Sequence, residues 1–211
     1  MCGRFVITNS VAKTKSIVKT AIKVENTENY NAHPYQNLPV IKKYTNGNTL
    51  ELLKWGIVPS WSKQKDFKPL INARLETIDE KISFKKHIKL HRCVVVADGF
   101  YEWKREDKKK TPFYFLRNDK KMIFIAGIFE DNQFCLITEQ AAQNVNEIHH
   151  RQPVILNEKD INNYLNLQLD GSNFLKEANK PKLEFYEISK DVNKPTNNNI
   201  SLIQKINKFI L

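Results

Sequence analysis

The chain has 211 residues, of which 41% are hydrophobic, and a formal net charge of +11. This length suits one domain over residues 1–211, with enough apolar residues for a full core. No apolar run approaches the roughly 20 residues that a membrane helix needs, and no signal-peptide pattern precedes the first strand. We therefore expect a cytoplasmic protein that does not contact membranes. The charge favours polyanionic partners, most simply nucleic acid.

The predicted elements are mainly strands, because short apolar or alternating runs end at charged or Gly- and Asn-containing turns. The hairpin around Asn46-Gly47 is the clearest of them. In chain order we expect a strand at Phe5 to Thr8, a helix from Asn9 or Ser10 to about Ile22, strands at Leu38 to Tyr44 and Leu50 to Val58, a helix from about Ile78 to Leu90, strands at Cys93 to Ala97, Pro112 to Arg117, Met122 to Glu130 and Phe134 to Thr138, a short helix at Glu158 to Leu165 and a strand at Leu183 to Ile188.

The three cysteines are Cys2, Cys93 and Cys135. They are an odd number and form no CxxC pair, which argues against both a zinc site and a disulfide framework. Cys93 and Cys135 lie in strand-like runs and are predicted to be small buried hydrophobes. We expect neither a metal nor a cofactor.

Cys2 differs from the other two because removal of Met1 would leave an α-amine and a thiol on one carbon skeleton. Such a 1,2-aminothiol captures an aldehyde: the amine forms an imine, and the sulfur then closes a five-membered thiazolidine. Reference pKa values of about 7.7 to 8.0 for the amine and about 8.5 for the thiol predict that both are partly nucleophilic near neutral pH. The alternative is an incidental, frayed cysteine. Gly3 and the strand that begins at Phe5 favour an anchored terminus.

Two further segments carry candidate chemistry. Asn72 and Arg74 are two residues apart in an extended segment and so share a face, where an amide and a guanidinium suit a hydroxyl or carbonyl next to a phosphate. The alternative is an ordinary polar loop. Glu102 lies between Tyr101 and Trp103 after an apolar strand, and such surroundings raise the pKa of a carboxyl and make it a proton shuttle. A solvent-facing residue in simple alternation is an equal alternative.

The segment His149-His150-Arg151 precedes a short apolar run. Adjacent histidines in an extended segment face opposite ways, so we expect at most one of them at a given site. A zinc site lacks further ligands at usable spacing, whereas acid/base chemistry or phosphate binding needs only one histidine and one arginine. Trp55 is predicted to lie in the core. For Trp61 the sequence allows two alternatives, a place in the core or stacking on unpaired bases.

Five motifs occur in this order across about three quarters of the chain: Met1-Cys2-Gly3-Arg4-Phe5, Trp55-Gly56-Ile57-Val58-Pro59-Ser60-Trp61, Ile71-Asn72-Ala73-Arg74-Leu75-Glu76-Thr77, Ala97-Asp98-Gly99-Phe100-Tyr101-Glu102-Trp103 and His149-His150-Arg151-Gln152-Pro153-Val154-Ile155-Leu156. Each motif is weak alone, and the order makes the set specific. Together they resemble the SRAP family, the SOS response-associated peptidases or abasic-site processing proteins, and Asp191-Val192-Asn193 is similar to the closing segment of that family. Gln152 stands where the family often has methionine or arginine, and His150 where it often has an acidic residue; neither is a catalytic position.

The resemblance implies an α+β domain with a barrel-like antiparallel sheet, flanking helices and a basic groove for single-stranded DNA. It implies an exposed Cys2 that cross-links to abasic sites. It assigns Asn72 to orienting the terminus or opened sugar, and Glu102 and His149 to proton transfer. The flanking phosphates would be bound by Arg4, Arg74 and Arg151, and Trp61 would pack against a base or the sugar.

The expected function is therefore a covalent thiazolidine cross-link between Cys2 and abasic sites in single-stranded DNA, which shields the strand during the DNA-damage response. Abasic-site lyase and autopeptidase activities are expected beside it. The alternatives are a cysteine-type peptidase that pairs Cys2 with His149, and a non-catalytic single-strand binder. We expect a monomer that associates with the nucleoid when bound to DNA.

Overall fold

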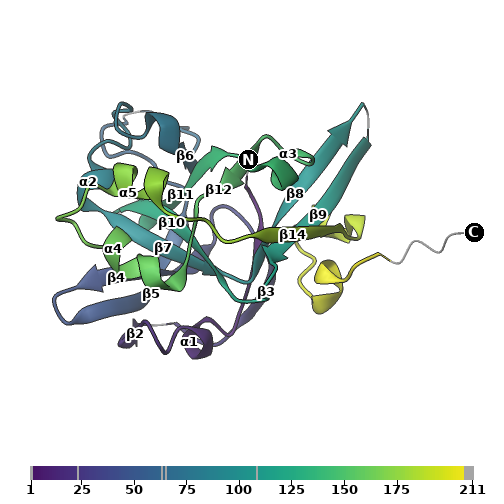
Figure 1. The fold of residues 1–211 in the computed structure, drawn as a ribbon, viewed down its shortest axis with the longest axis horizontal. Helices are drawn as coiled ribbons and strands as arrows, with labels where there is room; N and C mark the ends of the chain where they lie inside the picture. The colour runs from purple at the N-terminus through teal and green to yellow at the C-terminus, as the bar shows by residue number, and fades with distance from the viewer. Residues whose placement is uncertain (1, 23, 63, 65, 108, 207–211) are drawn as a thin grey trace, which may run out of the picture.

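The computed structural model describes residues 2–22, 24–62, 64, 66–107 and 109–206. Strands dominate and the helices are short, which confirms the α+β prediction (Figure 1). The strands are β1 Phe5–Thr8, β2 Thr20–Ile22, β3 Glu28–Ala32, β4 Asn37–Tyr44, β5 Gly47–Trp55, β6 Asn72–Arg74, β7 Arg92–Ala97, β8 Gly99–Glu106, β9 Lys109–Arg117, β10 Ile123–Glu130, β11 Gln133–Gln140, β12 Arg151–Pro153, β13 Ile155–Leu156 and β14 Leu183–Glu187. The α-helices are α1 Ser10–Lys13, α2 His87–Leu90, α3 Gln143–Asn146, α4 Ile161–Tyr164 and α5 Gly171–Glu177.

The larger sheet has the order β12-β11-β10-β7-β4-β5-β2, with β13 added on β10 and β6 on β11. A parallel pairing of β11 with β5 at Phe134 and Trp55 joins the sheet into a ring. The expected barrel-like sheet is therefore present, but it is mixed rather than purely antiparallel, since β6 also runs parallel to β11. Residues from all sides of this ring fill its interior and form the main core.

The second sheet has the order β14-β9-β8-β1-β3 and places the first strand of the chain between two others. β1 pairs antiparallel with β8 and with β3, so the segment that follows Cys2 is fixed on both edges. Phe5 joins the two sheets because its ring lies 5.1 Å from that of Trp55, measured between centroids. The terminus is thus anchored, as the strand pattern predicts.

The strand and core predictions hold because apolar runs and turn residues specify them locally. Cys93, Cys135 and Trp55 are fully buried, as predicted. The hairpin of β4 and β5 turns at Gly47, whose φ of +120° favours glycine. The hairpin of β10 and β11 also lies where the sequence predicts it, whereas β8, which pairs with β9, is not among the predicted strands.

The two long helices predicted from the sequence are wrong. The first is reduced to α1, after which Thr20 pairs with Thr49 of β5 and the chain continues as β2. Its apolar face is imperfect, and β-branched residues suit a sheet edge better than a helix. The second consists of turns that end in α2. Ile78 and Ile88 are buried while Ile82 is 67% exposed, so the apolar residues do not share one helical face. The helix expected at Glu158 to Leu165 is present as a 3-10 turn followed by α4.

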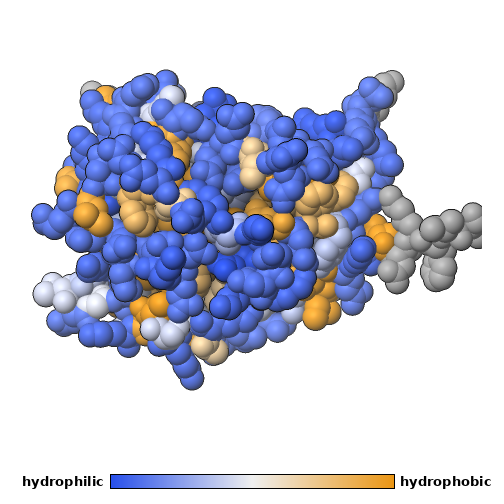
Figure 2. Space-filling view, in the orientation of Figure 1, coloured by the Kyte–Doolittle hydropathy of each residue, from blue (hydrophilic) through white to orange (hydrophobic). Residues whose placement is uncertain are grey.

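Hydrophilic residues cover most of the face in Figure 2, with apolar residues scattered among them. No helix in the described part of the chain is long and apolar enough to cross a membrane. Among the described residues, no three His, Cys, Asp or Glu side chains gather in a way that could hold a metal ion.

Candidate active site at the N-terminal cysteine

Cys2 lies just before β1 and is held by its backbone. The side-chain nitrogen Nδ2 of Asn72 donates a hydrogen bond to the carbonyl oxygen of Cys2 at 3.0 Å. Two residues further on, the carbonyl of Arg4 accepts from the backbone N–H of Tyr101 at 3.0 Å. The sequence pair Cys2 and Asn72 is therefore brought into direct contact by strands from the two different sheets.

The thiol of Cys2 is fully buried rather than exposed, which corrects the exposure that the family resemblance implies. Burial raises the pKa of this thiol, and the negative charge of Glu102 raises it further. The prediction of a partly ionised thiol near neutral pH concerns the terminus without Met1 and stays a prediction. Met1, whose removal we expect, lies outside the described residues.

Glu102 is in the middle of β8 and is 3% exposed, so the solvent-facing alternative is wrong. Burial raises the pKa of its carboxyl above the ordinary value, as the flanking aromatic residues predict. Because the charge of Glu102 acts on the Cys2 thiol, the two side chains belong to one site. The carboxyl is thereby kept closer to its protonated form near neutral pH.

Asn72 and Arg74 lie on β6, with the buried Ala73 between them, and so point to one side of the strand. β6 runs parallel to β11, and Arg74 is opposite Thr138. Arg74 is exposed, whereas the side-chain oxygen Oδ1 of Asn72 is buried and has no hydrogen-bond partner among the described residues. This acceptor next to Cys2 is available to a ligand or to the terminus.

His149 lies at the bend before β12, on the other edge of β11 from β6. Its Nδ1 lies 3.0 Å from the backbone nitrogen of Arg151 and 3.2 Å from the carbonyl oxygen of the same residue, so the backbone of Arg151 holds this ring nitrogen in either neutral tautomer. Burial lowers the pKa of His149 to about 4, so the ring is neutral near pH 7. The rings of His149 and His150 stack with centroids 4.5 Å apart. The prediction that they face opposite ways is wrong because the bend breaks the strand alternation.

Of the three arginines expected to bind phosphates, Arg4 and Arg151 donate hydrogen bonds to residues that lie far away in the sequence. Arg151 makes a bidentate ion pair with Glu76 at 2.7 and 2.9 Å and also donates to the carbonyl of Thr138 at 2.8 Å. Nη1 of Arg4 donates to Oδ1 of Asn31 at 2.6 Å and to the carbonyl of Val192 at 2.7 Å. Arg74 is the arginine of the three that has no side-chain bond among the described residues.

The tryptophans near the site differ in their surroundings. Trp61 is 51% exposed, beyond the core and beside Phe67, with ring centroids 6.2 Å apart. Trp103, next to Glu102, donates through Nε1 to Oδ1 of Asn193 at 2.7 Å, and the ammonium of Lys110 lies 4.7 Å from the centre of its ring. The sequence reading assigns no role to Trp103 or to Asn31. Asn31 is buried in β3, whose sequence Glu-Asn-Tyr-Asn-Ala carries no apolar pattern that could have identified it.

Comparison with solved structures places the fold among known ones. A crystal structure of a protein from Bacteroides thetaiotaomicron superposes with a TM-score of 0.83 at 23% identity, covering 97% of this chain and 100% of the other. A phage-related protein from Bordetella bronchiseptica superposes with a TM-score of 0.74 at 22% identity, covering 90% and 95% of the two chains. The chain is therefore an α+β protein of this established fold, with a cysteine near its N-terminus.

Sequence comparison adds the family. The family model described as SOS response associated peptidase (SRAP) matches residues 1–195. Abasic site processing protein YoqW of Bacillus subtilis is 33% identical, with 97% of this chain and 99% of that protein covered. Abasic site processing protein YedK of Escherichia coli is 29% identical, with 98% and 100% covered. The chain belongs to the SRAP family, and the resemblance found in its motifs is confirmed.

Proposed function

We propose that this protein captures abasic sites in single-stranded DNA as a covalent thiazolidine through Cys2, after Met1 has been removed. The observation that carries the proposal is the position of Cys2: its carbonyl is bound by Asn72 and its thiol lies within the electrostatic reach of Glu102. Membership in a family of abasic site processing proteins supports the choice of substrate. The net charge of +11 supports a nucleic-acid partner.

The reaction begins with the neutral α-amine of Cys2 adding to the aldehyde of the ring-opened sugar. The carbinolamine then loses water, and the departing oxygen needs a proton. Glu102 is suited to donate it, because burial raises the pKa of this carboxyl. The buried Oδ1 of Asn72 is suited to accept a hydrogen bond from the amine or from a sugar hydroxyl.

Ring closure joins the thiol sulfur to the imine carbon, while the imine nitrogen gains a proton. Since the thiol has a raised pKa, its proton must leave as the carbon–sulfur bond forms. His149 is the candidate acceptor, because its lowered pKa leaves the ring neutral. The thiazolidine carbon is no longer an electron sink, so the adduct resists the β-elimination that an imine promotes. The strand is thereby protected, and lyase activity is the expected result when sulfur is absent.

A cysteine peptidase is the other enzymatic candidate, as the description of the family suggests. Such an enzyme needs a thiolate paired with an imidazolium. Burial raises the pKa of Cys2 and lowers that of His149, so both groups favour their neutral forms. The pKa shifts therefore support the aldehyde chemistry better than a thiolate–imidazolium pair. A non-catalytic single-strand binder requires neither Asn72 nor a buried Glu102 beside Cys2.

The test is the intact mass of the protein under denaturing conditions, with and without single-stranded DNA that contains one abasic site. We expect a protein that begins at Cys2 and gains the mass of the DNA minus water. A tetrahydrofuran analogue of the abasic site has no aldehyde and is the matched control. Cys2→Ala retains the amine, so we expect no stable adduct but an imine that borohydride traps and that cleaves the strand. An unreacted protein that begins at Cys2 would contradict the proposal.

A further inference from the structure

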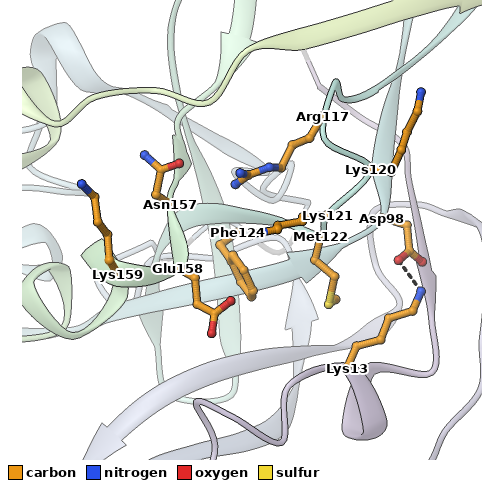
Figure 3. A pocket seen from close by; sticks show the side chains of 10 residues that line it. All are labelled: Lys13, Asp98, Arg117, Lys120, Lys121, Met122, Phe124, Asn157, Glu158 and Lys159. Carbon is orange, nitrogen blue, oxygen red and sulfur yellow. Dashed lines mark hydrogen bonds and ion pairs between the residues drawn. The ribbon is translucent and has the colours of Figure 1, made fainter.

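A basic cavity of about 580 Å³ lies beside the end of β1 that is farther from Cys2 (Figure 3). Its lining comes from α1, from the corner after β7, from the turn between β9 and β10, and from the segment after β13. β1 connects the two sites: Cys2 precedes the strand, and Thr8 at its end donates from its backbone to Asp98 of the cavity at 2.8 Å. Six extended residues span about 20 Å, so a small ligand in the cavity does not reach Cys2.

Arg117 is the cation of this cavity whose guanidinium is held in one orientation by a neighbouring side chain. It ends β9, is 9% exposed, and its guanidinium extends across the cavity toward Asn157 in Figure 3. Nε and Nη2 donate to the two carboxylate oxygens of Asp119 at 2.8 and 2.6 Å, which fixes the plane of the guanidinium. In the described residues no acceptor is bonded to Nη1. The guanidinium is therefore positioned in advance, with one nitrogen available to an anion.

The charges around Arg117 favour an anion. Five cationic side chains and two carboxylates line the cavity, and the cations are Lys13, Arg117, Lys120, Lys121 and Lys159. The ammonium of Lys13 is paired with Asp98 at 2.5 Å, and that of Lys120 with Glu184. Lys121 and Lys159 have no ion pair within the part of the chain that the structure describes. Two lysines thus line the cavity without an ion pair, whereas the charge of Arg117 is matched by Asp119 and Glu158 adds one carboxylate to the lining.

The size and the remaining lining indicate the chemical class of the ligand. A volume of this size is typical of sites for small organic molecules. Phe124 and Met122 provide an apolar floor, which lies below the guanidinium in the view of Figure 3. Phosphate groups match the combination of a fixed guanidinium and mobile ammonium groups. The floor gives a non-phosphate part of the ligand an apolar surface to contact.

We propose that this cavity is a second anion site, separate from Cys2, which binds phosphate esters of nucleotide size. The same chemistry can come from a free nucleotide or from the backbone of a bound strand. This proposal is independent of the reaction at Cys2, because it requires none of the residues of that site.

The experiment measures binding of inorganic pyrophosphate, a nucleoside diphosphate and an oligothymidine without an abasic site, by calorimetry at low salt. The test variant is Lys121→Glu/Lys159→Glu, which leaves the buried Arg117 in place. Lys85→Glu/Lys89→Glu is the matched control, because it makes the same charge change at two exposed positions, one in the turn before α2 and one in α2. Lys121→Gln/Lys159→Gln removes both charges without adding new ones and covers the case in which the reversal variant does not fold.

We expect the small anions to bind saturably, the test variant to weaken their binding at least about tenfold, and the control to change it less than about twofold. That result supports a site for free nucleotides. If the small anions do not bind, but the test variant weakens binding of the oligothymidine more than the control variant does, the phosphates that the cavity binds belong to the DNA backbone. Equal behaviour of the test and control variants toward all three ligands would overturn the proposal. Cross-linking at Cys2, measured in parallel, is expected to remain unchanged.

Discussion

Nη1 of Arg4 and Oδ1 of Asn31 are joined by a 2.6 Å hydrogen bond between two neighbouring strands, β1 and β3. The amide nitrogen of Asn31 donates to three carbonyls of the C-terminal segment, those of Val192, Lys194 and Asn197, at 3.3, 3.1 and 2.9 Å. Asn31 is 1% exposed. Together with the direct hydrogen bond from Arg4 to the carbonyl of Val192, this side chain ties the segment after Cys2 to residues 192–197.

We expect Asn31→Ala to lower the free energy of unfolding by about 2 to 4 kcal/mol, because it removes the donor to the carbonyls of Lys194 and Asn197 and one of the two acceptors of Arg4. Urea denaturation monitored by circular dichroism measures the change. Asn163→Ala, on the exposed side of α4, is the control and is expected to stay within about 0.5 kcal/mol. A loss as small as that of the control would show that Asn31 does not hold the C-terminal segment.

Glu102→Gln is expected to slow cross-linking by about 10²- to 10⁴-fold, since an amide cannot donate the proton that the carboxylic acid supplies. Single-turnover kinetics on abasic DNA measure the rate. Glu106→Gln, an exposed position on the same strand, should react at the normal rate.

The stability of these variants separates chemistry from folding. The pKa of Glu102 is raised in the folded protein, so its contribution to stability is largest below the unfolded pKa and is lost as pH rises through the folded pKa. Relative to the native chain, Glu102→Gln should therefore gain stability as pH rises. A slow variant that is also unfolded at neutral pH would contradict the catalytic role.

The imidazole of His149 should not titrate between pH 7 and 5 and should protonate near pH 4, because burial lowers its pKa to about 4. Two-dimensional NMR of the ring carbons follows this directly, with the signal assigned by its loss in His149→Gln. Because the folded pKa is depressed, stability is full above the ordinary value of 6.5 and falls as pH decreases toward 4. Titration of this signal at an ordinary histidine pKa would remove the argument for a neutral base.

Arg74 and Arg151 should affect DNA binding differently. Arg74 is exposed and has no side-chain bond among the described residues, so Arg74→Ala is expected to reduce the slope of log K against log salt by about 0.7 for single-stranded DNA. Fluorescence anisotropy at several salt concentrations measures it.

Arg151→Lys should act mainly on stability, because lysine cannot reproduce the bidentate pair with Glu76. We expect little change in its salt slope. An equal loss of slope in both variants would instead assign Arg151 directly to a phosphate.

The strands and the central pair of the site could be predicted from the sequence because their signals are local. Alternation and turn residues specify the hairpins, and the flanking aromatic residues indicate the raised pKa of Glu102. The partners of Arg4 and Arg151 could not be predicted, since Asn31 and Glu76 are brought to them by the pairing of strands distant in sequence. The burial of Cys2 and the stacking of His149 on His150 likewise depend on packing and on a bend that no local pattern shows.

The hydrogen bond from Asn72 reaches Cys2 at its carbonyl, which is on the opposite side of the α-carbon from the peptide bond to Met1. Cleavage of that peptide bond leaves the carbonyl and its hydrogen bond chemically unchanged. An amine created by this cleavage would therefore already be held beside β6 by the hydrogen bond from Asn72, and no separate docking step would be needed. If Met1 is removed as we propose, the alignment of Cys2 by Asn72 precedes that cleavage and does not depend on it.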